Sequence, residues 1–275
     1  MEKKTIICPV DFTNVSSIAL EYASIFTQKI AGDLVIIHVI DRSTSTAANA
    51  TSSPYSTPGG YDKLINEKLE ALRGDLERKD GISVRTKIEY GNLEDIVPIF
   101  ANDKETALVV MGTSGAKGIK EVFSGTHTIK VLERTFCPVL VIPEEAEFTI
   151  PQYWVYATDV KNNNEADANK IWQLCSLFDA KLDLLHVEKE RGKKEMELEE
   201  TKTLQDRSGE AIITFNKVKH KDILEGINQY IGEKEPDILA VIQHEHKKWD
   251  WLFKEDKISK IVENANFPIL VLREE

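Results

Sequence analysis

The chain has 275 residues, which exceeds the usual size of one domain and suggests two domains of about 130–150 residues each. Its content of 41% hydrophobic and 29% charged residues is ordinary for a soluble globular protein. The formal net charge of −11 argues against non-specific binding to nucleic acid and against attachment to an anionic membrane surface.

Cysteine content and apolar runs narrow the class of protein further. Cys8, Cys137 and Cys175 lie far apart, whereas a disulfide framework or a zinc ribbon needs more cysteines at closer spacing. No apolar run approaches the about 20 residues of a membrane span. The apolar stretch near Met1 is too short for a signal peptide. We therefore expect a cytoplasmic protein with reduced thiols and without a membrane partner.

The first half of the chain alternates between strand patterns and helix patterns. Apolar, β-rich runs predict strands at residues 5–10, 34–40, 82–88, 107–111 and 139–142. Apolar residues at helical spacing predict helices through Ile18–Ile30, Leu64–Leu76, Ile96–Phe100 and Ile129–Leu132. The segment Ser43–Gly60 is rich in Ser, Thr, Ala, Pro and Gly and reads as a mobile loop or lid. This alternation predicts a parallel sheet with helices on both faces.

The same pattern then starts again after a short charged link at Glu144–Pro151. Asp11 and Asp159 are as far apart in the sequence as His38 and His186. The segment Cys137–Val141 is echoed by Phe267–Val271 at a smaller offset, so the second repeat is shorter by roughly the length of the Ser/Thr loop. Two consistent offsets with matching residues indicate a tandem duplication.

A glycine pattern follows the strand at residues 107–111. Gly112 and Gly115 are three residues apart, and after nine more residues come Gly125 and Thr126 at the start of a helical pattern. A loop without Cβ atoms and a helix N-terminus with free N–H groups both suit a phosphate chain. The spacing G-x-x-G, nine residues, G-[S/T] resembles the nucleotide-binding motif of the universal stress protein family. The alternative is that the glycines serve turn geometry alone.

The resemblance covers nearly the whole chain as two modules. It implies an α/β fold of two tandem flavodoxin-like or Rossmann-like modules, each with a five-stranded parallel sheet flanked by helices. We expect a nucleotide-binding domain at residues 1–146 and a degenerate domain at residues 150–275. The family also implies that the modules pair within the chain and that the chain forms a homodimer.

Ligands of open α/β sheets lie beyond the carboxyl ends of the strands, where the strand order reverses. The resemblance implies that Asp11 and Val39 contact adenine, that Gly112 and Gly115 follow the ribose and phosphates, and that the start of the next helix donates to phosphate oxygens. The full candidate set is Pro9, Asp11, Val39, Met111, Gly112, Thr113, Gly115, Gly125, Thr126, His127 and Thr128.

Each of these residues also has a purely structural alternative. Asp11 can be a turn carboxylate at a strand end, and Val39 can be ordinary core packing. Thr126 and Thr128 can be helix-start residues. Lys117 and Lys120 could supply counter-charge to phosphates, or be solvated loop lysines.

The second module departs from the motif where the glycine loop is expected. After the predicted strand Ile238–Ile242 the chain reads Gln243–Trp249, and Glu255 and Asp256 stand where the first module has Gly125 and Thr126. Two carboxylates repel an anion, so we expect a structural role for this module. His244 and His246 are too few ligands for a zinc site. The apolar cluster of Trp249, Trp251, Leu252 and Phe253 suggests an intermodule contact.

The resulting hypothesis is an ATP-binding sensor or regulator of the stress response that binds nucleotide in its first module only. The resemblance leaves ATP, AMP and ADP open as the ligand, and a magnesium ion could accompany the phosphates. No dedicated metal site and no catalytic residues are predicted, because no catalytic base or arginine finger stands near the loop. The alternatives are slow ATP hydrolysis or self-phosphorylation, and an interaction scaffold that binds no nucleotide.

Overall fold

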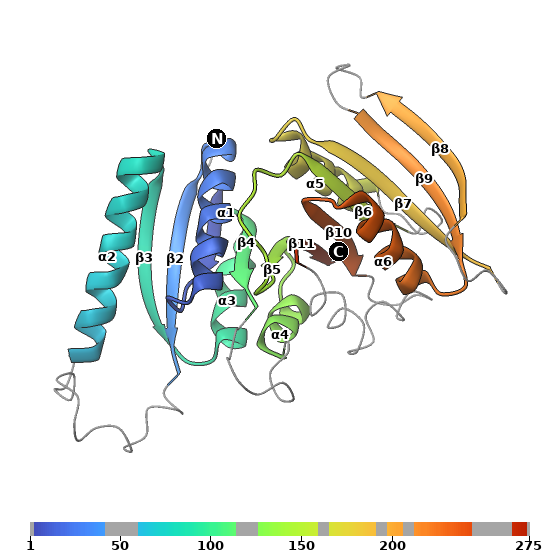
Figure 1. Cartoon of the computed structure of the whole chain (residues 1–275). Coiled ribbons are helices and arrows are strands. Elements are labelled where there is room, and N and C mark those ends of the chain that lie inside the picture. Colours follow the sequence, from blue (N-terminus) through green and yellow to red (C-terminus); the bar gives the residue numbers. More distant parts are fainter. Residues whose placement is uncertain are drawn as a thin grey trace. The chain divides into compact units, whose positions relative to one another are not determined.

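The computed structural model describes residues 3–41, 60–113, 126–158, 165–190, 197–205, 212–243 and 266–273 (Figure 1). The chain divides into two compact units, residues 1–144 and 145–275. Each unit is an α/β fold in which strands and helices alternate, so the predicted fold class is confirmed.

The sheet of the first unit is fully parallel, and its strand order is β3-β2-β1-β4-β5. The chain adds strands outward from β1 to β3, then returns to the other side of β1. The strand bounds are β1 Thr5–Pro9, β2 Asp33–Ile40, β3 Ser83–Tyr90, β4 Thr106–Gly112 and β5 Val139–Ile142. All five strands lie where the sequence predicts them. Continuous apolar runs suit the largely buried strands β1, β2, β4 and β5, whereas β3 at the sheet edge alternates polar and apolar residues and is partly exposed.

Helices cover both faces of this sheet. Their bounds are α1 Asn14–Ile30, α2 Gly60–Asp80, α3 Leu93–Ala101 and α4 Thr126–Arg134. Helices α1 and α2 contact each other, as do α3 and α4. Right-handed crossovers place α1 and α2 on one face of the sheet and α3 and α4 on the other. The reason is that successive strands are added toward one edge of the sheet up to β3 and toward the opposite edge after it.

Helix α1 shows why these segments form helices. Thr13 caps its first turn by accepting a hydrogen bond from the N–H of Ser16 at 3.3 Å. Tyr22 and Phe26, one turn apart on the predicted apolar face, are fully buried. Ala31 ends the helix in the left-handed conformation, and its N–H donates to the Gln28 carbonyl.

The second unit repeats this plan with one change. Its strand order is β11-β10-β6-β7-β9-β8, and its described helices are α5 Glu165–Ser176 and α6 Ile223–Lys234. The strands are β6 Tyr153–Ala157, β7 Lys181–Lys189, β8 Glu197–Gln205, β9 Ile212–His220, β10 Ile238–Gln243 and β11 Ile269–Arg273.

Strand β8 departs from the five parallel strands expected for this unit. It pairs antiparallel with β9 and is the sixth described strand of the unit. It follows β7 in the chain, at the point where the first unit has the Ser/Thr-rich segment and α2. The shorter connection therefore forms an antiparallel edge strand, which a short link to β9 permits.

Matching backbone hydrogen bonds in the two units support the duplication. The N–H of Val109 donates to the Pro138 carbonyl at 2.9 Å, and the N–H of Leu239 donates to the Pro268 carbonyl at 3.1 Å. In the same way the N–H of Val10 donates to Ile37, and that of Thr158 donates to Leu185. The register of β4 with β5 and of β10 with β11 makes Gly112 and Ile242 equivalent positions.

Several sequence predictions fall on residues outside the described ranges. These are the loop up to residue 59, the glycines and lysines at 115, 117, 120 and 125, the histidines at 244 and 246, the apolar cluster at 249–253, and the carboxylates at 255 and 256. In the described part of the chain, no helix is both long and apolar enough to cross a membrane.

Two glycines of α6 give a matched test of this packing. An added Cβ at Gly226 would lie 2.8 Å from Val187 and 2.9 Å from the Cβ of His220, whereas one at Gly232 meets nothing within 4 Å. We expect Gly226→Ala to lower the free energy of unfolding by about 1–3 kcal/mol through overpacking. Gly232→Ala should raise it by up to about 1 kcal/mol through helix propensity.

Urea unfolding of the two variants checks this prediction. Equal effects of the two substitutions would show that α6 does not pack on β7 and β9 as described.

Candidate functional site

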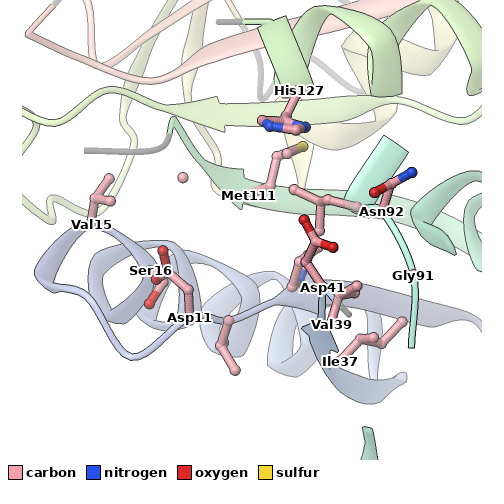
Figure 2. A pocket seen from close by; sticks show the side chains of 14 residues that line it. Asp11, Val15, Ser16, Ile37, Val39, Asp41, Gly91, Asn92, Met111 and His127 are labelled. Atoms are coloured by element: carbon pink, nitrogen blue, oxygen red, sulfur yellow. The ribbon is translucent and has the colours of Figure 1, made fainter. Parts of the chain in front are cut away.

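A cavity of about 230 Å³ opens at the carboxyl ends of β1, β2 and β4, where the strand order of the first unit reverses (Figure 2). The first turn of α1, the β3–α3 turn and the start of α4 complete its wall. The lining residues are Pro9, Val10, Asp11, Val15, Ser16, Ile37, Val39, Asp41, Gly91, Asn92, Leu93, Met111, Gly112 and His127.

Asp11 is held in a tight turn between β1 and α1. Its Oδ1 accepts hydrogen bonds from the N–H and the hydroxyl of Thr13, at 3.0 and 2.5 Å. Burial opposes ionisation of this carboxyl, but the hydrogen bonds from Thr13 and Ser16 outweigh it and hold the pKa of Asp11 below its usual value. Asp11 therefore stays ionised at the mouth of the cavity.

Phe12 makes this turn possible at some conformational cost. Its φ of 63° lies in the left-handed region, which a large side chain rarely adopts. The Phe12 ring packs on His38 with 5.0 Å between ring centroids, and the ammonium of Lys68 lies 5.0 Å from its centroid. These contacts hold the turn that presents the Asp11 carboxylate.

A buried histidine joins the ends of β1 and β2. The Nδ1–H of His38, a residue only 7% exposed, donates to the Val10 carbonyl at 2.7 Å. In the second unit His186 makes the equivalent bond to the Thr158 carbonyl at 3.2 Å. His38 therefore holds together the strand ends that carry the cavity wall, although it does not itself line the cavity.

Gly112 forms the cavity wall at the end of β4. A Cβ at this position would lie 3.0 Å from Val15 Cγ2 and 3.3 Å from the Val15 carbonyl carbon. Glycine thus allows β4 and the first turn of α1 to approach closely, with Met111 beside it on the lining. Gly91, at the β3–α3 turn, has a φ of 146° that favours glycine.

His127 carries a titratable group into the cavity and is tied to α3 by a carboxylate. Its Nδ1 lies 2.6 Å from Glu94 Oε2, and the ammonium of Lys130 donates to Glu94 Oε1 at 3.1 Å. Burial opposes ionisation of Glu94, but the hydrogen bonds from His127, the backbone and Lys130 outweigh it and lower its pKa to about 2. Glu94 is therefore ionised throughout the physiological pH range.

The structure brings together six of the eleven residues proposed from sequence, namely Pro9, Asp11, Val39, Met111, Gly112 and His127. Thr113 follows β4, donates from its N–H to the Ile142 carbonyl, and does not line the cavity. Thr128 is 3% exposed within α4 and is also absent from the lining. Thr126 begins α4, while Gly115 and Gly125 lie outside the described residues.

Sequence reasoning did not identify the remaining lining residues. Asp41 follows Val39 at the same strand end, and Gly91 and Asn92 follow β3 at the same sheet edge. The rule that ligands lie beyond the carboxyl ends of strands could have identified all three. Within the described ranges no three His, Cys, Asp or Glu side chains form a group that could hold a metal ion.

A parallel α/β unit with a cavity at the reversal of strand order has the architecture of the doubly wound proteins, whose ligands bind at that place. Within that class the glycine spacing and the fold select one family. The chain belongs to the universal stress protein family, whose model matches residues 3–143.

Individual relatives agree with this assignment. The chain is 26% identical to a universal stress protein of Methanocaldococcus jannaschii over 50% of this chain and 94% of the relative. It is 28% identical to one of Bacillus subtilis over 48% of this chain and 94% of the relative. The solved structure of a universal stress protein from Archaeoglobus fulgidus shares the fold over 100% of both chains, with a TM-score of 0.71 at 13% identity.

The Glu94 cluster should make a measurable contribution to stability. Removing the charge in Glu94→Gln leaves a weaker partner for His127 and Lys130, and we expect a loss of about 1–3 kcal/mol in the free energy of unfolding. The control Asp95→Asn removes an exposed carboxylate that pairs with Arg134, and should cost less than about 1 kcal/mol. Similar losses from both substitutions would contradict a special role for Glu94.

The contribution of Glu94 should also depend on pH in a defined direction. Folding lowers the pKa of Glu94 from its usual 4.5 to about 2. A lowered pKa stabilises the fold above the unfolded value, so the contribution is complete above about pH 4.5 and is lost as the pH falls toward 2. Urea unfolding of wild type and Glu94→Gln between pH 3 and 7 measures this, and a difference that stays constant over the range would contradict it.

Proposed function

We propose that the first unit binds an adenine nucleotide in the cavity at the reversal of strand order, and that the protein acts as a nucleotide-dependent regulator in the stress response. The observation that carries this proposal is the convergence of Pro9, Asp11, Val39, Met111 and Gly112 on one cavity. These residues belong to three strands, and the family resemblance attaches all of them to the nucleotide.

The proposed binding mode follows from the lining. The base lies near Asp11 and Val39, and the ribose and phosphates follow Gly112 toward the start of α4. ATP, ADP and AMP share this part of the ligand, and a magnesium ion would be held mainly by the phosphates. In this mode Gly115, Gly125 and Thr126 are proposed phosphate contacts on the strength of the motif spacing alone.

We propose that the second unit does not bind nucleotide. The position of Gly112 is occupied there by Ile242, a buried residue at the carboxyl end of β10. A branched side chain at this position replaces the glycine that allows close approach in the first unit. The family resemblance suggests that this unit pairs with the first unit. It also suggests that the chain forms a homodimer, and light scattering of the purified protein would test the homodimer.

The engagement of the carboxylates favours binding over catalysis as the role of the site. Asp11 already accepts two hydrogen bonds from Thr13, and Glu94 holds His127 and Lys130. A general base for phosphoryl transfer must be able to accept a proton from the attacking group. Carboxylates with lowered pKa values that are bound in this way suit a rigid binding site better.

The first test is the identity and amount of nucleotide carried by the purified protein. Denaturation followed by chromatography should release close to one adenine nucleotide per chain. The motif variant Gly115→Val should lose it, and Glu255→Ala in the second repeat should keep it. Two nucleotides per chain would contradict binding by the first unit only. No nucleotide, and no uptake of added ATP with magnesium, would leave the interaction scaffold as the function.

A cavity-filling variant tests the location of the site. Val39 lines the cavity, whereas its neighbour Ile40 is absent from the lining and points to the other face of the strand. We expect Val39→Phe to weaken ATP binding at least tenfold, about 1.4 kcal/mol, by occupying the space for the base. Ile40→Phe should leave the affinity within about twofold. Calorimetric titration of both variants with ATP measures the two affinities. An unchanged affinity in Val39→Phe would show that the nucleotide binds outside this cavity.

A further inference from the structure

The imidazole of His127 connects the cavity to a buried carboxylate. His127 lies in the first turn of α4 and lines the cavity, on the side away from Asp11 and Val39 (Figure 2). Its side chain is 42% exposed, whereas that of Glu94, 2.6 Å from Nδ1, is only 10% exposed. One ring therefore contacts both the ligand space and a charge held within the unit.

The hydrogen bond to Glu94 determines what the ring can offer a ligand. An ionised carboxylate only accepts hydrogen bonds, so Nδ1 must carry a proton. The other ring nitrogen, Nε2, is then an acceptor in the neutral ring and a donor in the charged ring. A phosphate oxygen needs a donor, and it therefore selects the charged ring.

Several other charged groups lie around the His127 ring and contribute to the charge that the ring experiences before a ligand enters. Lys130, on the same helix, neutralises the second oxygen of Glu94. The carboxylates of Asp11 and Asp41 line the cavity from the ends of β1 and β2. Among the described residues, Asp95 of α3 and Arg134 of α4 also lie at this corner and pair with each other. An entering phosphate adds negative charge to this set, which favours the charged ring further.

We propose that His127, oriented by Glu94, takes up a proton when an anionic nucleotide enters the cavity, so that nucleotide binding by this protein weakens as the pH rises. This inference rests on the proposed function and adds a regulatory property to the same site. His127 contacts the phosphate directly. Glu94 is a positioning residue, because it acts on the ligand only through the ring.

The direction of the effect follows from proton linkage. Binding that takes up a proton is favoured at low pH, and the affinity falls by at most tenfold per pH unit when one proton is involved. We expect the affinity of wild type for ADP to fall more steeply with rising pH than that of His127→Gln, within this limit of tenfold per pH unit. The protons that ADP itself gains or loses are common to both proteins and cancel in this comparison.

Calorimetric titration with ADP in buffers of different ionisation enthalpy measures the proton count directly. Near pH 7 wild type should take up more protons than His127→Gln, by a fraction of a proton up to one. Adenosine, which carries no phosphate, is the matched ligand and should show no such difference. Glu94→Gln keeps a partner for Nδ1 but removes its charge, and should move the loss of affinity to lower pH.

Histidine NMR of the wild-type protein provides a measurement that does not depend on the variant binding ADP. The chain has six histidines, and the His127 signal is identified by its absence in His127→Gln. Its titration midpoint should rise on addition of ADP and stay constant with adenosine, while that of His186 in the second unit should not change.

The outcomes separate this inference from the function on which it rests. No binding of ADP or adenosine by wild type at any pH overturns the proposed function. Binding of ADP with the same proton count in wild type and His127→Gln, or with an unshifted His127 titration, overturns the proton-linked role alone. If His127→Gln fails to bind ADP, the wild-type His127 signal decides whether the proton-linked role holds: a midpoint that rises with ADP supports this role, and an unchanged midpoint overturns it.

Discussion

The pairing of β1 with β2 on one side and with β4 on the other is the constraint on which the site depends. Because the chain builds outward to β3 and then returns across β1, the connections that leave β1 and β4 go to opposite faces of the sheet. The carboxyl edge between these strands is therefore left open. The turn after β1, the end of β2 and Gly112 line the space that results.

The two units share one backbone plan but differ at the position that forms the cavity wall in the first unit. They share the hydrogen bonds at Val109 and Leu239 and the histidine bonds from His38 and His186. These features preserve the strand ends. At the equivalent strand terminus the two units differ, with glycine at 112 and the branched side chain of isoleucine at 242.

The sequence was informative wherever one local pattern determined the outcome. The apolar runs of the first unit became its five strands, and the spacing of Tyr22 and Phe26 placed the buried face of α1. Pro9, Asp11, Val39, Met111 and Gly112 were identified because a motif or a strand end marks each of them.

Features that depend on distant or compensating residues were not predictable in the same way. The Glu94–His127 pair joins residues 33 positions apart, and neither segment alone marks the other. Strand β8 replaces a helix because the shorter connection of the second repeat allows an antiparallel return, and a length difference alone does not distinguish that from a deleted loop. The left-handed Phe12 is held by packing on His38 and Lys68, which no turn propensity indicates.

The distribution of charge at this edge is compatible with the proposed binding of an anion by a chain whose net charge is −11. Glu94 and Asp95 lie in the first turn of α3, where the helix dipole favours negative charge, and their partners His127, Lys130 and Arg134 all lie on α4. The acidic groups at this corner are therefore compensated, whereas Asp11 and Asp41 line the opposite part of the cavity. In the proposed binding mode, a ligand with one neutral and one anionic end therefore has a preferred direction, with the base toward the carboxylates and the phosphates toward α4. This polarity follows from the packing of α3 against α4 and needs no basic surface elsewhere on the protein.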